Sequence, residues 1–408
     1  MCANVQHYYE TAKQNQENNP DGFSFSQELV QQIVRMKILI IAYNYPSKFC
    51  SADFVFVKML VDEFARNGHE CVVMAPHSVT HHKCLHHGIE EYNVGENTVK
   101  VVRPNYFSTS SLTIGKYYIS NVLHKFIVRR ALKHLKFEPD VVYCHFWKQG
   151  IEAFPFAKKR NLPLFVASGE CEIFEDNRKC ELKEFCEYVK GVICVSTKNK
   201  DESVALNLAK AKDCIVVPNS IDNTLFKKLD KIECRKKLGL PLDKTIIAFV
   251  GWFVDRKGSL RVSLALDGIP ENDVYSVFIG EGPEEPTNNN ILFKGKVLHD
   301  EVPLYLNAAD AFVLPTLQEG CCNAVVEAMA CGLPIISSNL PFNWDVLNKD
   351  NSIMVAPQNV EEIRLAIIKL RDDATKRAEM SNSALDMAKQ LTIQERAKKI
   401  LTFIKQRM

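Results

Sequence analysis

The sequence lacks the features that mark membrane, secreted and disulfide-stabilised proteins. No apolar run approaches the length of a transmembrane helix, and the 14 cysteines include no CxxC pair. The first 23 residues are polar and do not show the charged stub and apolar core of a secretion signal. These absences lead us to expect a cytoplasmic protein whose cysteines stay reduced.

The sequence also lacks a strong charge bias and a dinucleotide-binding fingerprint. Its 408 residues carry 51 basic and 49 acidic side chains, so any attraction to an anionic partner must come from a local patch. We expect no nucleic-acid partner. No GxGxxG follows the apolar runs KILIIAY or TIIAFVG, which argues against a dinucleotide-dependent oxidoreductase.

What the sequence contains is two consecutive series of strand and helix patterns behind a polar extension at residues 1–35. The first series opens with KILIIAY and includes a basic helix expected over 116–137, and the second opens with TIIAFVGWF. Continuous apolar strands that alternate with amphipathic helices are typical of parallel sheets covered on both faces. We therefore predict an α/β protein with two Rossmann-like, doubly wound domains at 36–215 and 216–385, followed by a helix at 386–408 that can pack back on the first domain.

One segment of the second series, LPTLQEGCCNAVVEAMACGLPIISS, has the pattern of a ligand site. It reads as a strand, a loop, a helix, a tight stop at Gly332 and a second strand. The helix therefore begins at the carboxyl edge of a parallel sheet, where α/β proteins bind ligands. Free backbone N–H groups at Cys322, Asn323 and Ala324 can receive an anion such as a diphosphate.

Two carboxylates bracket this helix start. Glu319 lies in the loop and Glu327 about one turn into the helix, where the helix dipole favours negative charge. Carboxylates accept hydrogen bonds from pairs of hydroxyl groups, so the two suit a ligand with a sugar at each end of a diphosphate. The alternative is that Glu327 is an ordinary helix-start carboxylate and Glu319 a solvated loop residue.

The stretch EGCCNAVVEAMACGLPIISS resembles the E-x7-E region of family 4 of the retaining glycosyltransferases, of the bacterial surface-polysaccharide type. Further motifs agree in order and spacing, namely NGHE, PNSIDNTLF, VGWFVDRKG, FIGEGP, FKGKV and LNAADAFVLPT. The resemblance implies the GT-B architecture, in which two Rossmann-like domains face a central cleft. It also implies that the donor binds the C-terminal domain and the acceptor the N-terminal one.

The resemblance further implies a hexosyltransferase-like, metal-independent enzyme that uses a UDP- or GDP-linked sugar as co-substrate and needs no cofactor. Glu327 would bind the ribose hydroxyls, Glu319 the hydroxyls of the donor sugar, and Lys257 the diphosphate. A buried ammonium beside two phosphates would stabilise the charge that grows on the leaving group. A solvated turn lysine is the alternative for Lys257. The implied donor contacts are Gly251, Arg256, Lys257, Gly280, Gly282, Lys296, Val297, Glu319, Gly320, Cys321, Cys322, Asn323 and Glu327.

The chain departs from the family pattern in the donor half at one position. Where the family has an arginine after the glycine matched by Gly251, this chain has Trp252. The usual phosphate fork is therefore absent there. Arg256, beside Lys257, can reach the phosphates instead, which is a hypothesis about this chain alone.

The acceptor half is less clearly indicated. His145 ends the strand DVVYCHF where the family has a histidine near the reacting sugar, so we assign it to the catalytic set with Glu319 and Lys257; a structural histidine is the alternative. The family's His-Gly is replaced by Ser168 and a glycine, followed by Glu170. The implied acceptor contacts are Asp53, Ser168 and Glu170.

Two further segments can be interpreted in two ways each. The run THHKCLHHG, residues 80–88, can be a metal site if it folds back on itself, but a solvated loop fits better because no second ligand pair follows, and we predict no metal. The basic, aromatic segment 116–136 can rest on anionic lipid, which would bring the enzyme to a lipid-linked acceptor at the inner face of the membrane, or it can be a partly buried helix with a solvated cationic side.

The sequence as a whole favours retaining transfer of a sugar from a nucleotide-sugar to a hydroxyl of a polysaccharide or lipid-linked glycan. A nucleotide-sugar epimerase or hydrolase on the same fold is one alternative. Such an enzyme would turn over the donor without an acceptor. A weakly active, donor-binding partner subunit is the other alternative, suggested by the replacements at Trp252 and Ser168.

Overall fold

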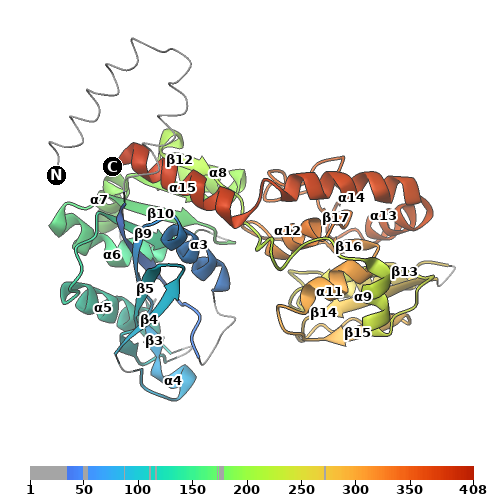
Figure 1. Ribbon diagram of the computed structural model, residues 1–408, viewed down its shortest axis with the longest axis horizontal. Helices are drawn as coiled ribbons and strands as arrows, with labels where there is room; N and C mark the ends of the chain where they lie inside the picture. The colour runs from blue at the N-terminus through green and yellow to red at the C-terminus, as the bar shows by residue number, and fades with distance from the viewer. Residues whose placement is uncertain are drawn as a thin grey trace, which may run out of the picture.

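The chain forms two α/β domains, seen side by side in Figure 1. The computed structural model describes residues 35–48, 54–86, 88–109, 112–114, 117–171, 173, 179–270 and 273–408. The predicted extension up to residue 34 and Asp53 therefore lie outside the described residues.

The first domain is organised by an eight-stranded sheet in the order β12-β11-β10-β9-β1-β2-β5-β4. Its strands are parallel except for β4, which pairs antiparallel with β5 at one edge. The strands are β1 (Lys37–Ala42), β2 (Glu70–Met74), β4 (Ile89–Val94), β5 (Asn97–Val102), β9 (Val141–His145), β10 (Leu164–Ser168), β11 (Gly191–Cys194) and β12 (Cys214–Val216). The helices are α3 (Val55–Arg66), α4 (Val79–His82), α5 (Ile119–Lys133), α6 (Trp147–Arg160), α7 (Lys179–Tyr188), α8 (Thr197–Ala205) and the 3-10 turn η2 (Ala211–Asp213).

Two details of this domain differ from the sequence prediction. The basic helix is shorter than 116–137, because Tyr117–Tyr118 form the short strand β8, which pairs with β7 (Thr113–Ile114) before α5 begins. The edge strand β4 was not predicted, since its residues alternate between exposed and half-buried positions. A second short pair is formed by the parallel strands β3 (His77–Ser78) and β6 (Asn105–Tyr106).

The second domain has a fully parallel six-stranded sheet in the order β15-β14-β13-β16-β17-β18. The strands are β13 (Thr245–Val250), β14 (Val274–Ile279), β15 (Ile291–Gly295), β16 (Ala311–Leu314), β17 (Ile335–Ser338) and β18 (Ser352–Val355). The helices are α9 (Lys231–Leu238), α10 (Ser259–Asp267), α11 (Val302–Ala308), α12 (Asn323–Ala330), α13 (Val360–Asp372) and α14 (Ala374–Ala388). This strand order is that of a dinucleotide-type Rossmann fold.

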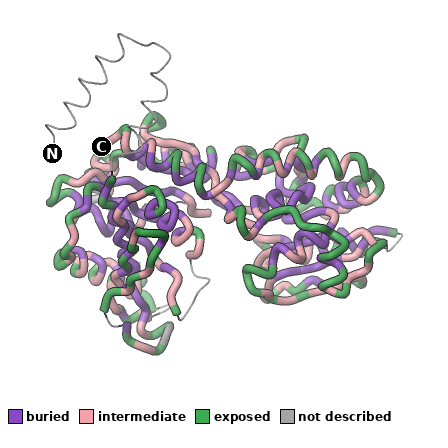
Figure 2. Tube along the Cα trace, in the orientation of Figure 1, coloured by how far each residue is buried: buried purple, intermediate pink, exposed green. Residues whose placement is uncertain are grey.

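The central strands of both sheets are buried because nearly all of their residues are apolar and helices cover both faces. Strand β1, for example, is exposed only at Lys37, and Figure 2 shows buried residues running through the interior of both domains. None of the helices in the described ranges is long and apolar enough to cross a membrane. The two doubly wound α/β domains predicted from the sequence are confirmed by the strand orders of the two sheets.

The chain crosses between the domains twice. On the return, the last helix α15 (Ile393–Arg407) packs against α3 and β11 of the first domain, and its residues Ile400 and Ile404 belong to that domain's core. The two crossings touch, because the N–H of Ile221 donates to Leu391 O and that of Ile393 to Ile221 O. The domains are thus joined at one pair of adjacent backbone segments.

Candidate functional site between the two domains

Each sheet has a point where the chain reverses its direction of winding, and ligands of α/β proteins bind at such points. In the first sheet β1 lies between β2 and β9, and in the second β13 lies between β14 and β16. The carboxyl ends of these strands carry His145, at the end of β9, and the loop that follows β13 from Gly251 to Gly258. Most of the residues predicted for the site lie on these loops and on their neighbours.

Glycines let the loops after β13 and β14 approach closely. Gly280, which follows β14, has a φ of +149°, and a side chain there would overlap the carbonyl of Gly251. A side chain at Gly282 would likewise overlap the carbonyl of Phe253. The predicted donor residues Gly251, Gly280 and Gly282 therefore belong to one tightly packed wall.

Glu319 lies between two cations. Its Oε1 is 2.6 Å from Lys257 Nζ and 2.7 Å from Arg256 Nη1, and it also accepts a hydrogen bond from the hydroxyl of Thr316 at 3.0 Å. Burial alone would lower the pKa of Lys257, but the neighbouring Cys322 and Glu319 raise it above its ordinary value. The lysine is thus a half-buried cation at the carboxyl end of β13 and β16, where a bound anion would meet it.

Arg256 reaches toward both domains. Its Nη1 donates to Gln318 O at 2.7 Å and approaches the sulfur of Cys171, in the first domain, at 3.8 Å. Trp252, at the position where the family has an arginine, is 62% exposed. The structure therefore holds a second cation beside Lys257, supplied by Arg256.

The start of α12 is fixed by a neighbouring amide. Asn219 Nδ2 donates to Cys321 O at 2.9 Å and to Asn323 Oδ1 at 2.7 Å. Burial raises the pKa of the Cys322 thiol to about 11, although the N–H groups of Val325 and Ala324 act to lower it. The Cys322 side chain forms no cap hydrogen bond at the start of α12, so the availability of the N–H groups at Cys322, Asn323 and Ala324 for an anion stays a prediction.

Glu327 occupies the next turn of α12 and contacts His299. Its Oε1 lies 3.4 Å from His299 Nε2, and its side chain is 15% exposed. Lys296 forms an ion pair with Glu281, and Val297 packs on the domain core, so both predicted donor residues lie on the loop that leads to His299. His299 was not singled out from the sequence, since a histidine in a polar loop gives no periodic signal.

His145 lies in a small interdomain cavity of about 10 Å³ that is lined also by Asn219, Asn323 and Arg396. Burial, and then the charge of Arg396, lower the pKa of His145 to about 3, so the ring is neutral at physiological pH. Its Nδ1 has no hydrogen-bond partner among the described residues. The structure thus brings His145 to the start of α12, as the prediction required, and a cavity of this size can hold one water molecule.

The other predicted acceptor residues are engaged within the first domain. The hydroxyl of fully buried Ser168 accepts a hydrogen bond from Trp147 Nε1 at 3.1 Å. The Glu170 carboxylate accepts from the N–H of Trp147, the first residue of α6, at 3.0 Å and from that of Gly169 at 2.9 Å. Burial raises the pKa of Glu170 to about 7. Both side chains therefore hold the edge of the first sheet together.

The two halves of the site touch at Gly320. A side chain there would overlap the carbonyl of Gly169 and come within 3.2 Å of the Glu170 carbonyl oxygen. A second contact joins Thr197 to Asp345, whose carboxylate accepts from the N–H and the hydroxyl of Thr197 at 2.7 and 2.6 Å. The loop after β10 thus rests directly on the loop that carries Glu319.

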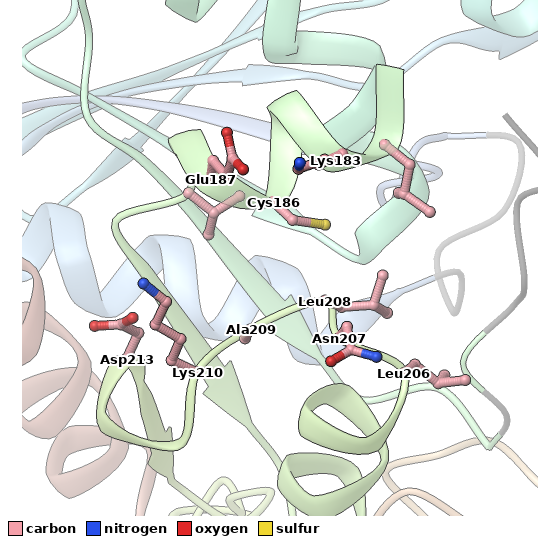
Figure 3. Close-up of a pocket in the computed structure, with 11 residues that line it drawn as sticks. Lys183, Cys186, Glu187, Leu206, Asn207, Leu208, Ala209, Lys210 and Asp213 are labelled. Atoms are coloured by element: carbon pink, nitrogen blue, oxygen red, sulfur yellow. The ribbon is translucent and has the colours of Figure 1, made fainter. Parts of the chain in front are cut away.

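Two other features lie away from this site. In the histidine-rich segment 80–88, His86 Nε2 pairs with Glu90 at 2.8 Å, and the described residues contain no group of three His, Cys, Asp or Glu side chains that could hold a metal ion. A cavity of about 740 Å³ lies between α7 and the loop after α8, and Figure 3 shows its lining by residues such as Cys186, Leu208 and Lys210. It contains none of the predicted site residues.

Comparison with known proteins gives consistent matches. The family model "Glycosyltransferase Family 4" matches residues 54–225, and "Glycosyl transferases group 1" matches residues 230–387. A Bacillus subtilis glycosyltransferase assigned to teichuronic acid biosynthesis is 27% identical over 85% of this chain and 92% of its own length. An Escherichia coli UDP-Gal:alpha-D-GlcNAc-diphosphoundecaprenol alpha-1,3-galactosyltransferase is 26% identical over 60% of this chain and 69% of its own.

Solved structures share the fold. Sucrose-phosphate synthase from Thermosynechococcus elongatus superimposes with a TM-score of 0.74 at 18% identity, covering 91% of this chain and 99% of that one. The Anabaena protein HepE, solved with UDP and glucose, gives 0.67 at 16% identity, covering 91% and 100%. At these identities the likeness concerns the fold alone.

Proposed function

Because the chain is a family 4-type glycosyltransferase with the GT-B fold, we propose that it moves a sugar, with retention of configuration and without a metal, from a UDP- or GDP-linked donor to a hydroxyl of a glycan or lipid-linked glycan. The observation that carries this proposal is the contact of Lys257 with Glu319, 2.6 Å apart at the carboxyl end of β13 and β16. The relatives named for teichuronic acid biosynthesis and for galactosyl transfer to alpha-D-GlcNAc-diphosphoundecaprenol support the acceptor class.

The geometry suggests how the groups act. In the proposed complex the diphosphate lies against Lys257 and Arg256, and Glu319 exchanges part of its contact with these cations for the hydroxyls of the donor sugar. The acceptor oxygen forms a bond to the anomeric carbon from the same face on which the bond to the diphosphate breaks, and the departing diphosphate takes the acceptor proton. The two cations stabilise the negative charge that appears on the leaving group, where preorganised charge has its largest effect.

The test is a panel of donors that also distinguishes a transferase from the two alternatives. UDP- and GDP-sugars are incubated with the enzyme, with and without a lipid and polysaccharide extract, and both nucleotide release and product are measured. Acceptor-dependent release from one donor, with product of retained anomeric configuration, is expected, and Glu319→Gln should abolish it. Equal release without acceptor would indicate the hydrolase or epimerase. Donor binding without any release would indicate a partner subunit.

We further propose that the exposed face of α5 brings the enzyme to an anionic membrane. The side chains of Tyr118, Val122 and Phe126 are spaced four residues apart and are 54%, 53% and 60% exposed. From Glu96 to Glu138 the chain contains no other acidic residue but carries eight lysines and arginines. In Figure 1 this helix lies on the side of the first domain remote from the second. Apolar anchors among cations match a surface of anionic lipid.

This surface is tested by co-sedimentation with vesicles of phosphatidylcholine alone or mixed with phosphatidylglycerol. Binding to the anionic vesicles is expected to weaken with salt and to be lost in the double variant V122S/F126S. Leu264, 59% exposed on α10 of the second domain, provides the matched control L264S, which should bind normally. Equal sedimentation of all three proteins, or none by the wild type, would contradict the proposal.

A further inference from the structure

Among the described residues, His299 is the side chain that makes a polar contact with Glu327, the carboxylate proposed to bind the donor ribose. The contact joins His299 Nε2 and Glu327 Oε1 at 3.4 Å. The two residues come from different elements, because His299 lies in the loop between β15 and α11 and Glu327 on α12. The loop between β15 and α11 therefore contacts the proposed donor site at Glu327.

The histidine ring is held from behind by an aromatic contact. Phe226, which is 2% exposed and belongs to the core of the second domain, meets the ring edge-on with centroids 5.2 Å apart. The ring edge that remains faces Glu327, while the His299 side chain is 49% exposed. A bound nucleotide that contacts Glu327 would therefore come up against His299.

The charges around His299 favour its protonated form. Glu327 of α12, then Asp300 of its own loop and Asp222 of the segment before α9 raise the pKa of His299, against the lowering effect of burial. All three facing groups are carboxylates. In the protonated state the ring is a cation next to the acceptor oxygens of Glu327.

We propose that His299 is a positioning residue for the donor nucleotide, which holds the Glu327 carboxylate in place for the ribose hydroxyls and, when protonated, adds a cation to the pocket for an anionic donor. The inference rests on the proposed function, since it needs Glu327 to bind the ribose. Because His299 does not touch the bond that breaks, it acts on donor affinity and leaves the rate of chemistry unchanged. Because the contact is a single ion pair of a half-exposed side chain, its effect on donor affinity is modest.

The experiment measures binding of UDP and of GDP by calorimetry between pH 6 and pH 9, with donor KM and kcat where turnover is available. His299→Ala is expected to weaken binding of the preferred nucleotide about five-fold at pH 6, the size of a partly exposed ion pair. The loss should shrink as pH rises and the wild-type ring loses its proton. His299→Asn, which keeps an N–H but no charge, should recover part of the affinity and show no such pH dependence. KM is expected to change and kcat to remain.

Two controls separate the possible failures. His81→Asn replaces a histidine on α4, outside the site, and should bind nucleotide as the wild type does. Glu327→Ala should weaken binding at every pH. If Glu327→Ala weakens binding while His299→Ala does not, the positioning role is overturned and the donor site stands. If neither variant weakens binding, the proposed donor site is wrong and the positioning role is wrong with it.

Discussion

The two domains are both doubly wound around a mainly parallel sheet, but they differ in how they use the carboxyl edge of that sheet. In the second domain the charged groups at this edge, Lys257, Arg256 and Glu319, pair with one another. In the first domain the corresponding groups serve the fold, because Ser168 bonds to Trp147 and Glu170 caps the start of α6. The proposed donor half is thus preorganised for charge, whereas the proposed acceptor half contributes packed polar groups and the neutral ring of His145.

This difference predicts its largest effect at Lys257. Replacing it with methionine keeps much of the apolar stem but removes the cation from a half-buried position beside Glu319. We expect kcat to fall about a hundred- to a thousand-fold, the usual cost of losing one preorganised group at a developing anion. Initial-rate kinetics with the donor found in the panel measures this. The control is Lys244→Ala, a half-exposed lysine of the same domain, and an equal loss there would show that the effect is not specific to the site.

The next effect concerns Glu170 and appears as a pH dependence of stability. Its pKa is raised by burial from 4.5 to about 7, so the folded protein binds its proton more tightly than the unfolded chain. Stability due to this group is present below about pH 4.5 and is lost as pH rises to about 7, where it levels off. The full difference is on the order of 3 kcal/mol.

Glu170→Gln isolates this contribution. Urea unfolding is measured at several pH values for the wild type and the variant, and the wild type should lose stability relative to the variant between pH 4.5 and 7. Glu184→Gln, a change of a half-exposed carboxylate in the same domain, should leave the wild-type profile unchanged. Parallel profiles for the wild type and Glu170→Gln would mean that Glu170 has an ordinary pKa in the folded protein.

A smaller effect is expected at the contact between the halves. In Gly320→Ala the added methyl group overlaps the Gly169 carbonyl, so the loops must separate although each domain can still fold. We expect kcat/KM to fall about ten-fold, equivalent to roughly 1.4 kcal/mol, with little change in melting temperature. Gly268→Ala is the matched control, because its methyl group meets a flexible arginine side chain and helix carbonyls only. Unchanged kinetics in Gly320→Ala would show that this contact is not needed for turnover.

The donor half could be predicted from the sequence because its parts are close together in the chain. Strand β16, the loop with Glu319 and helix α12 follow one another without interruption, so periodicity and the glycine stop fix their order and direction. Lys257 was found only through the family resemblance, because its ion pair with Glu319 joins two loops that are 62 residues apart in the sequence. The contact of the neighbouring Arg256 with Glu319 likewise spans 63 residues. The local pattern gives the elements, and packing between loops gives the ion pairs.

The acceptor half could be predicted less well for the same reason. The Ser168 hydroxyl meets the Trp147 indole across 21 residues, and the Glu170 carboxylate meets the Trp147 N–H across 23, from one loop to the next helix. Nothing in the letters SGE distinguishes a ligand-binding carboxylate from one that caps a helix. The contact of His299 with Glu327 escaped notice because it, too, joins two loops of different strands.

The last prediction, of similar size, tests whether Ser168 has a role beyond packing against Trp147. Ser168→Ala leaves the buried Trp147 Nε1–H without its acceptor, and we expect the free energy of unfolding to fall by about 1–2 kcal/mol, as is usual for an unsatisfied buried donor. Because the hydroxyl faces the indole rather than the cleft, the KM for the acceptor should stay unchanged. Thermal unfolding together with acceptor titrations measures both quantities. A raised acceptor KM with unchanged stability would reverse the comparison, because Ser168 would then serve the ligand and the first domain would also hold polar groups free for substrate.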